Sequence, residues 1–145
     1  MTRVRFYNIS FIPGKELIYS VIAARFQGKW IFVRHNEHST WEIAGGHIEP
    51  GESPGDAAER ELIEETGAKE FKIECVSGYS VEKEGSTGYG RLYFAEVTSL
   101  GEIPDKSEIA EICLFESLPE NLTYPDIQPH LFARVLEFLE KRNSL

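Results

Sequence analysis

Three glutamates share one face of a helix that the sequence predicts in the middle of the chain. At about 100° of rotation per residue, Glu64 and Glu65 fall within roughly 60° on either side of Glu61. Like charges at these i+3 and i+4 spacings destabilise an isolated helix by about 0.2–0.5 kcal/mol per pair. We therefore expect a positive group at this face, and Arg60 is turned about 100° away from it. Since carboxylate oxygens are hard ligands, the pattern predicts a site for Mg²⁺ or Mn²⁺ rather than zinc.

The helix that would carry these glutamates has clear start and stop signals. Ser53 reads as its N-cap, Pro54 as its first residue, and Gly67 is placed to end it in the left-handed conformation. Ala58 and Leu62 form a neighbouring stripe that can bury against a sheet. The acidic side chains are therefore expected at the edge of the buried surface.

Two glycines, Gly45 and Gly46, lie just before this helix in the short apolar run 41–47. They predict a sharp backbone turn that brings a carbonyl oxygen close to a ligand. The alternative is a solvated acidic helix face, but the glycines and the spacing together favour a metal site. The histidines of this region have no metal-ligand spacing, so we assign no chemistry to His35, His38 and His47.

Written as spacing, this stretch is Gly46, five residues, Glu52, seven residues, and then the run RELIEETGA at 60–68. It resembles the Nudix box, G-x5-E-x7-R-E-U-x-E-E-x-G-U, in which U is a bulky aliphatic residue. Every fixed position matches, and only the final aliphatic residue is reduced, to Ala68. Ala44 stands where many members of the family carry proline. The resemblance covers nearly the whole chain.

The resemblance implies metal-dependent hydrolysis of a nucleoside diphosphate linked to another group. Glu61 is then the candidate base within the box, and Arg60 is expected to orient Glu52 or Glu64 rather than to contact substrate. A further functional glutamate is expected downstream, and spacing does not choose between Glu108 and Glu111. The resemblance assigns catalytic roles to Arg60, Glu61, Glu64 and Glu111, and metal-binding roles to Gly45, Glu61, Glu64, Glu65 and Glu108.

The substrate marks of several Nudix branches are missing, which leaves a nucleoside triphosphate, including an oxidised purine, as the expected substrate. ADP-ribose, a nucleotide sugar, and nucleotide sensing without cleavage are the alternatives. Tyr124 and Asp126 resemble a base-recognition segment of the oxidised-purine enzymes, although the residues alone favour a helix cap at Asp126 with Tyr124 packed beneath it. Arg34 and Arg91 are the candidate phosphate contacts.

Composition predicts one soluble cytoplasmic domain over residues 1–145. The chain is 41% hydrophobic and 12% aromatic, which is ample for one core. A net charge of −9 argues against nucleic-acid binding, and no signal peptide or membrane-spanning run is present. Cys75 and Cys113 sit in apolar runs and are expected to be buried, reduced thiols. A homodimer is left open.

The periodicity of the chain predicts an α/β fold. Strands are expected at 4–11, 19–26, 29–34, 71–81, 91–97 and 109–115, with helices at about 54–66 and 129–141. A turn is predicted at Gln27 and Gly28, and a longer polar turn at 84–90. This order indicates a mixed β-sheet sandwiched between helices, which is also the Nudix-type α/β/α sandwich, with one catalytic helix after the glycine turn and one C-terminal helix.

Overall fold

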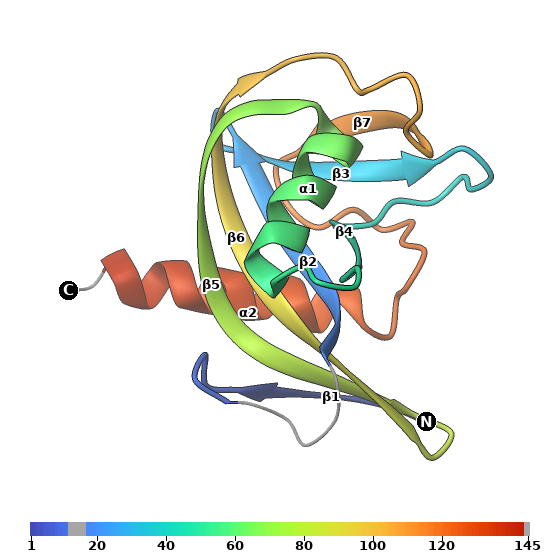
Figure 1. The fold of residues 1–145 in the computed structure, drawn as a ribbon, viewed down its shortest axis with the longest axis vertical. Helices are drawn as coiled ribbons and strands as arrows, with labels where there is room; N and C mark the ends of the chain where they lie inside the picture. The colour runs from blue at the N-terminus through green and yellow to red at the C-terminus, as the bar shows by residue number, and fades with distance from the viewer. Residues whose placement is uncertain (12–16, 144–145) are drawn as a thin grey trace.

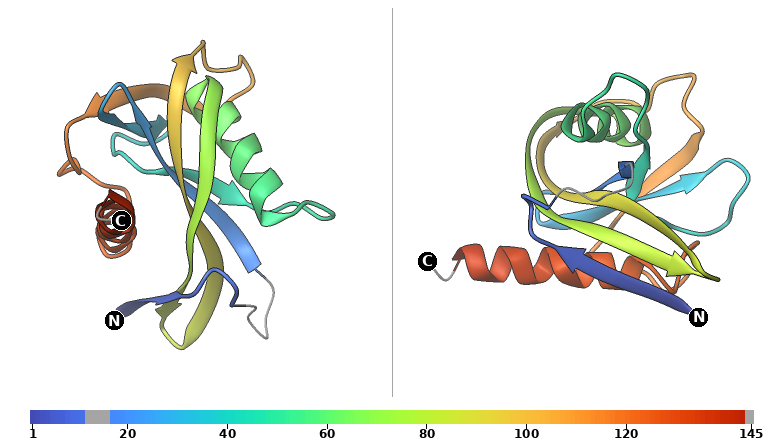
Figure 2. Two further views of the ribbon diagram at one scale, coloured as in Figure 1. Left: turned by 90° about the vertical axis from the view of Figure 1, so that its left-hand side faces the viewer. Right: turned by 60° about the horizontal axis from the view of Figure 1, so that its bottom comes forward.

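A mixed sheet lies between two helices in the computed structural model, which describes residues 1–11 and 17–143 (Figure 1). The two helices cover opposite faces of the sheet when it is viewed on edge (Figure 2, left). This confirms the predicted α/β/α sandwich. The elements are β1 (Thr2–Tyr7), β2 (Leu17–Phe26), β3 (Lys29–His35), β4 (Ala44–His47), α1 (Pro54–Thr66), β5 (Ala68–Lys83), β6 (Ser86–Leu100), β7 (Ile109–Phe115) and α2 (Gln128–Asn143).

The strands of the sheet follow the order β1-β5-β6-β2-β3-β7, and β4 pairs separately with β2. The β2–β6 pair is parallel, whereas the other pairs are antiparallel. Strand β2 therefore contacts β3, β4 and β6, and it lies at the centre of the part of the sheet that supports α1.

Alternating side chains on the central strands build a core on each face of the sheet. Ile22, Ala24 and Ile31 pack with Ala58 and Leu62 of α1, as the stripe on that helix predicted. The intervening residues face α2, where Trp30, Phe32 and Phe94 pack with Leu131, Val135 and Leu139. Each helix is thus fixed on the sheet by its own apolar stripe.

Two tight turns join neighbouring strands. Gln27 and Gly28 both have positive φ, at 52° and 79°, which is the geometry of a two-residue hairpin and confirms the predicted turn. Glu84 and Gly85 adopt the same geometry, at 52° and 80°. Because this second turn needs only two residues, 86–90 belong to β6 rather than to the longer polar turn that the sequence predicted.

Three other local expectations differ from the structure. Strand β1 ends at Tyr7 because the Asn8 side chain accepts hydrogen bonds from Ser10 and closes a turn. The glycines at 45 and 46 are extended within β4 rather than sharply turned. Cys113 is exposed rather than buried because β7 is an edge strand, whereas Cys75 is partly buried; both are free thiols.

In the described part of the chain, neither helix has the length and apolar character needed to cross a membrane. Helix α1 has the predicted caps. The Ser53 side chain accepts a hydrogen bond from Asp56 N–H at 3.0 Å, and Gly67, at φ 77°, donates its N–H to Ile63 O at 3.0 Å. These caps fix where the helix starts and ends.

We predict that Gly67→Ala destabilises the protein more than Gly28→Ala, although both glycines have nearly the same positive φ. A Cβ at position 28 would meet nothing within 4 Å, so only the backbone strain of about 1–2 kcal/mol applies there. A Cβ at position 67 would also lie 2.7 Å from Gly101 O and 2.8 Å from Glu102 O. Urea unfolding of both variants measures the difference, and equal losses would contradict the close packing at the end of α1.

Candidate active site

The acidic face of α1, which comprises Glu61, Glu64 and Glu65, presents its three carboxylates at different depths. The side chains of Glu61 and Glu65 are 13% and 9% exposed, whereas that of Glu64 is 52% exposed. The apolar stripe of the helix sets this rotation, because Ala58 and Leu62 are fully buried on the sheet. Two of the three carboxylates therefore lie in the seam between α1 and β4.

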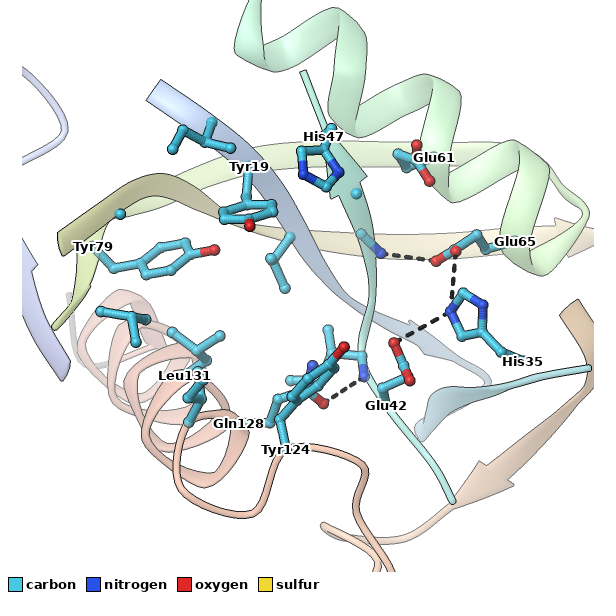
Figure 3. Close-up of a pocket in the computed structure, with 18 of the residues that line it drawn as sticks. Tyr19, His35, Glu42, His47, Glu61, Glu65, Tyr79, Tyr124, Gln128 and Leu131 are labelled. Carbon is cyan, nitrogen blue, oxygen red and sulfur yellow. Dashed lines mark hydrogen bonds and ion pairs between the residues drawn. The ribbon is translucent and has the colours of Figure 1, made fainter. Parts of the chain in front are cut away.

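Glu65 is the most deeply buried member of the acidic face. One carboxylate oxygen accepts a hydrogen bond from Gly45 N–H at 2.9 Å, and the other lies 3.7 Å from His35 Nε2 (Figure 3). Burial raises the pKa of Glu65 to about 8; the Gly45 hydrogen bond opposes this shift, and the charges of Glu61 and Glu42 reinforce it. Such a group readily holds a proton or a cation at neutral pH.

Glu61 faces β4 at Gly46. A Cβ at position 46 would lie 2.6 Å from the carboxylate carbon of Glu61, so glycine is required for this approach. Burial raises the pKa of Glu61, whereas the hydrogen bond and charge of Arg60 lower it. The charge of the neighbouring Glu64 raises the pKa further.

Arg60 is the cationic partner of the acidic face, which corrects the prediction that it is turned away, and its contacts include Glu52 and Glu64, the two residues that it was expected to orient. Its Nη1 lies 2.7 Å from Glu61 and 3.3 Å from Glu64, and two further hydrogen bonds of 2.7 and 3.0 Å reach Glu52. A long side chain can bend back along the helix surface, which its Cβ direction does not reveal. The two Arg60 hydrogen bonds, together with a third from Glu49 N–H, lower the pKa of Glu52 to about 2.

The structure also brings His35 and Glu42 beside the acidic face, where the sequence pattern predicted no role for them. His35 Nε2 lies 3.2 Å from one Glu42 carboxylate oxygen, and His38 Nδ1 lies 3.7 Å from the other. Glu42 reaches this place because its backbone forms two hydrogen bonds of 2.9 Å with Val33 at β3. This pairing joins residues nine positions apart, and packing of the sheet then places them beside α1, which residue spacing within the helix could not have indicated.

Two cavities meet at the acidic face. The larger, of about 750 Å³, is lined by β2, β4, the β5–β6 hairpin and the start of α2 (Figure 3). The smaller, of about 440 Å³, lies between α1 and the loop before β7. Four carboxylate residues line both cavities: Glu49, Glu61, Glu65 and Glu108. The acidic face therefore forms the junction between the larger cavity and the smaller one.

Only some of the site residues predicted outside α1 reach these cavities. Tyr124 lines the larger cavity and is 46% exposed, so it does not pack beneath α2. Glu108 lies at the junction, which separates it from Glu111, the other downstream candidate. Asp126 and Glu111 line neither of these two cavities.

The two predicted basic residues are held away from the cavities by their own contacts. Arg34 pairs with Glu111 at 2.9 Å, and Arg91 donates a hydrogen bond to Ile9 O at 2.9 Å. The lysines that do line the cavities are Lys83 in the larger and Lys106 in the smaller. In the described residues neither lysine forms an ion pair. Lys106 was missed because it lies in a loop far from the helix in sequence.

The chemistry of the acidic face fits a hard divalent cation. Its donors are carboxylate oxygens, and burial raises the pKa values of Glu61 and Glu65, which a nearby cation would lower. Within residues 1–11 and 17–143, no three His, Cys, Asp or Glu side chains are arranged so that they could hold a metal ion together. One reason is that Glu61 and Glu64 are both hydrogen bonded to Arg60. Gly45, a predicted carbonyl ligand, donates its N–H to Glu65.

Comparison with known proteins identifies similar sequences. A family model described as "NUDIX domain" matches residues 15–135. The chain is 35% identical over 102 residues to a Bacillus subtilis protein named "Putative 8-oxo-dGTP diphosphatase YtkD", covering 70% of this chain and 64% of that protein. A Streptomyces ambofaciens "MutT-like protein" is 29% identical over 82 residues, covering 57% and 51%. The chain thus spans less than two thirds of the length of these relatives.

Solved structures share the fold. A mutant of the Bacillus subtilis pyrophosphohydrolase BsRppH matches with a TM-score of 0.75 and 26% identity, over 92% of this chain and 90% of that one. A Caenorhabditis elegans Ap4A hydrolase matches with a TM-score of 0.65 and 14% identity, over 86% and 99%, and this likeness concerns the fold alone.

We predict that Glu65→Gln removes a pH-dependent loss of stability from the metal-free protein. The pKa of Glu65 rises from its ordinary 4.5 to about 8 on folding, so between these values the unfolded chain loses a proton that the folded protein keeps. The free energy of unfolding should therefore fall as the pH rises from about 5 to about 8. At about pH 8 in EDTA the variant should be more stable than wild type by on the order of 1–3 kcal/mol.

Urea unfolding in EDTA at both pH values measures this effect. The glutamine keeps an oxygen that can accept the Gly45 hydrogen bond, so the two proteins should have similar stability at about pH 5. A stability difference that does not change with pH would contradict the assignment of the raised pKa to Glu65.

Proposed function

This chain is a member of the Nudix family, and from that premise we propose that it hydrolyses a pyrophosphate bond in a nucleoside diphosphate linked to another group. The observation that carries the proposal is the partly buried acidic face at the junction of two cavities. The larger cavity, at about 750 Å³, has the size of a typical small-molecule site. The name of the Bacillus subtilis relative YtkD supports a purine nucleoside triphosphate, including an oxidised one, which would yield monophosphate and pyrophosphate.

We propose that Mg²⁺, or Mn²⁺ in its place, is held by the three carboxylates of the acidic face, with Glu108 and the Gly45 carbonyl as further donors. A bound cation of this kind neutralises charge on the pyrophosphate oxygens and lowers the pKa of a coordinated water. To free Glu61 and Glu64 for this role, Arg60 has to release them. Its two hydrogen bonds to Glu52 can keep the guanidinium beside the site.

Glu61 is the proposed general base of the reaction. Its carboxylate accepts a proton from the water whose oxygen attacks phosphorus, and the bond from phosphorus to the leaving oxygen breaks with its electron pair on that oxygen. The position of Glu61 supports this role, because its carboxylate lines both cavities and so lies beside the place proposed for the phosphates. Burial of the carboxylate beside Gly46 keeps it at the cavity junction.

The substrate's nucleoside is proposed to occupy the larger cavity, and its phosphates the junction. Tyr19 and Tyr124 offer aromatic surfaces for a base, and Tyr19 is itself packed against His47 with ring centroids 4.7 Å apart. Lys83 and Lys106, without ion-pair partners in the described residues, supply positive charge in a protein of net charge −9. They replace Arg34 and Arg91 as the candidate phosphate contacts.

We predict Mg²⁺-dependent release of pyrophosphate from at least one purine nucleoside triphosphate. The test measures phosphate and pyrophosphate release across canonical and oxidised triphosphates, ADP-ribose, dinucleoside polyphosphates and nucleotide sugars, with and without EDTA. Glu64→Gln should lower kcat by roughly 100-fold or more, because it removes a ligand charge. Its half-exposed side chain should leave the melting temperature nearly unchanged.

Tight binding of one nucleotide without turnover would replace the proposal with a sensing role. Turnover confined to ADP-ribose or nucleotide sugars would keep the reaction and change the substrate. Full activity of a folded Glu64→Gln variant would contradict the metal-binding role of the acidic face.

We further predict that Lys106→Met raises KM by about two- to fivefold, because an exposed charge contact contributes on the order of 0.5–1 kcal/mol. The matched control is Lys72→Met on the exposed surface of β5, which lines neither cavity. Steady-state kinetics at two salt concentrations separates them, since only the Lys106 effect should shrink as salt increases. Equal KM values for both variants would exclude Lys106 as a phosphate contact.

A further inference from the structure

His35, at the end of β3, links the acidic face to a carboxylate that the proposed reaction does not use. Its Nε2 lies 3.7 Å from Oε2 of Glu65 and 3.2 Å from Oε1 of Glu42 (Figure 3). Glu42 and Glu65 are buried and His35 is partly buried, so solvent screens these contacts only weakly. A single imidazole therefore bridges two carboxylates from different parts of the chain.

The sheet places His35 and Glu42 on the face that α1 covers. Side chains alternate along β3, so His35 shares the face of Ile31 and Val33, and Ile31 packs against α1. Glu42 lies directly opposite Val33 in an antiparallel bridge with two backbone hydrogen bonds of 2.9 Å. Long side chains on one face reach both their opposite and their diagonal neighbours. The bridge to β3 therefore brings the Glu42 carboxylate to the imidazole.

The backbone at the end of β3 is also fixed by β7. The register between the two strands shifts between Arg34 and His35, and Asn36 N–H donates a hydrogen bond to Glu108 O at 2.9 Å. A β-bulge of this kind redirects side chains and is common next to active sites. The backbone around His35 is thus held on both sides, which gives its imidazole a defined place beside α1.

Glu65 has one contact on each of its carboxylate oxygens. Gly45 N–H donates to Oε1 at 2.9 Å from β4, and His35 faces Oε2 from β3. An ionised carboxylate has about four sites that accept bonds, so two contacts leave other sites open to a cation. Contacts on both oxygens also limit rotation of the carboxylate, which reduces the conformational freedom that cation binding would remove.

We propose that His35 is a positioning residue for the cation at the acidic face, and that Glu42 orients its imidazole. This inference rests on the proposed function and goes beyond it, since neither residue is among the proposed cation ligands. With its proton on Nε2, a neutral imidazole donates toward both carboxylates and keeps the Glu65 oxygens in place. Removing a group that orients a metal ligand typically lowers metal affinity by about 10- to 100-fold.

The test measures the Mn²⁺ affinity of the nucleotide-free protein by calorimetry at one fixed pH. His35→Leu removes the donor and should weaken Mn²⁺ binding by about 10- to 100-fold. His35→Gln keeps an N–H donor on a side chain of similar reach, so its Mn²⁺ affinity should stay within about threefold of wild type. Because no nucleotide is present, the loss of a contact between His35 and substrate would not change this measurement.

A double-mutant cycle tests whether Glu42 acts through His35. Glu42→Asp keeps the negative charge but shortens the side chain, so it removes the contact with the imidazole without changing the charge near the cation. Alone it should weaken Mn²⁺ binding, by no more than His35→Leu does. In the His35→Leu background it should have almost no further effect, because the imidazole that Glu42 orients is absent. Equal losses in both backgrounds would contradict the proposed action of Glu42 through His35.

His38→Leu is the matched control. His38 Nδ1 lies 3.7 Å from the other Glu42 oxygen, and within residues 1–11 and 17–143 it forms no ion pair with Glu65. The variant should keep the wild-type Mn²⁺ affinity within about twofold. Equal losses in His35→Leu and His38→Leu would overturn the inference. So would a folded His35→Leu variant with unchanged Mn²⁺ affinity and only a lower Tm in EDTA, because His35 would then support the fold alone. If His35→Leu does not fold, unchanged affinity in Glu42→Asp overturns the inference.

The outcome is separable from that of the proposed reaction. Weaker Mn²⁺ binding in His35→Leu, restored in His35→Gln, would support the positioning role even if wild type hydrolysed no nucleotide. Metal-dependent hydrolysis by wild type, together with unchanged Mn²⁺ affinity in His35→Leu, would support the reaction and overturn the positioning role. A wild-type protein that binds no Mn²⁺ would overturn this inference and the proposed cation site together.

Discussion

Two ionisable carboxylates, Glu61 and Glu65, are buried in the seam between α1 and β4, and much of the surrounding structure compensates for that burial. A carboxylate removed from water needs hydrogen bonds, opposite charge or a proton. Gly45 N–H and His35 face Glu65, and Arg60 faces Glu61. The raised pKa values show that this compensation is incomplete, which is the property expected of a site that takes up a cation.

Two glycines allow β4 to pack closely on both sides, Gly45 against β2 and Gly46 against α1. A Cβ at Gly45 would lie 2.7 Å from Ser20 O on β2, and one at Gly46 would meet the Glu61 carboxylate. Ser20 in turn donates its hydroxyl to Pro54 O at 2.7 Å, which ties the first turn of α1 to the same strand. The glycines therefore serve close packing across the sheet, and the positions of the carboxylates depend on it.

The same short segment also organises the larger cavity. Ile43, next to β4, holds the Gln128 amide, and Gly45 holds Glu65. One stretch of backbone thus positions a side chain that lines the larger cavity and a group proposed to bind the cation. Because the backbone in or next to β4 holds both Gln128 and Glu65, the strand rather than a flexible loop sets the distance between these two side chains. This arrangement suits a substrate with a base at one end and a pyrophosphate at the other.

What the sequence determined by itself is local. The bounds of α1, 54–66, follow from its caps, and the grouping of Glu61, Glu64 and Glu65 follows from helical periodicity, so both were predictable. The tertiary structure alone decided which groups meet that face. His35, Glu42, Lys106 and Gln128 lie beside the two cavities through strand pairing and loop packing between segments that are separated from α1 in sequence. Such contacts depend on how sheet and helices pack in space, and residue spacing along the chain carries no record of them.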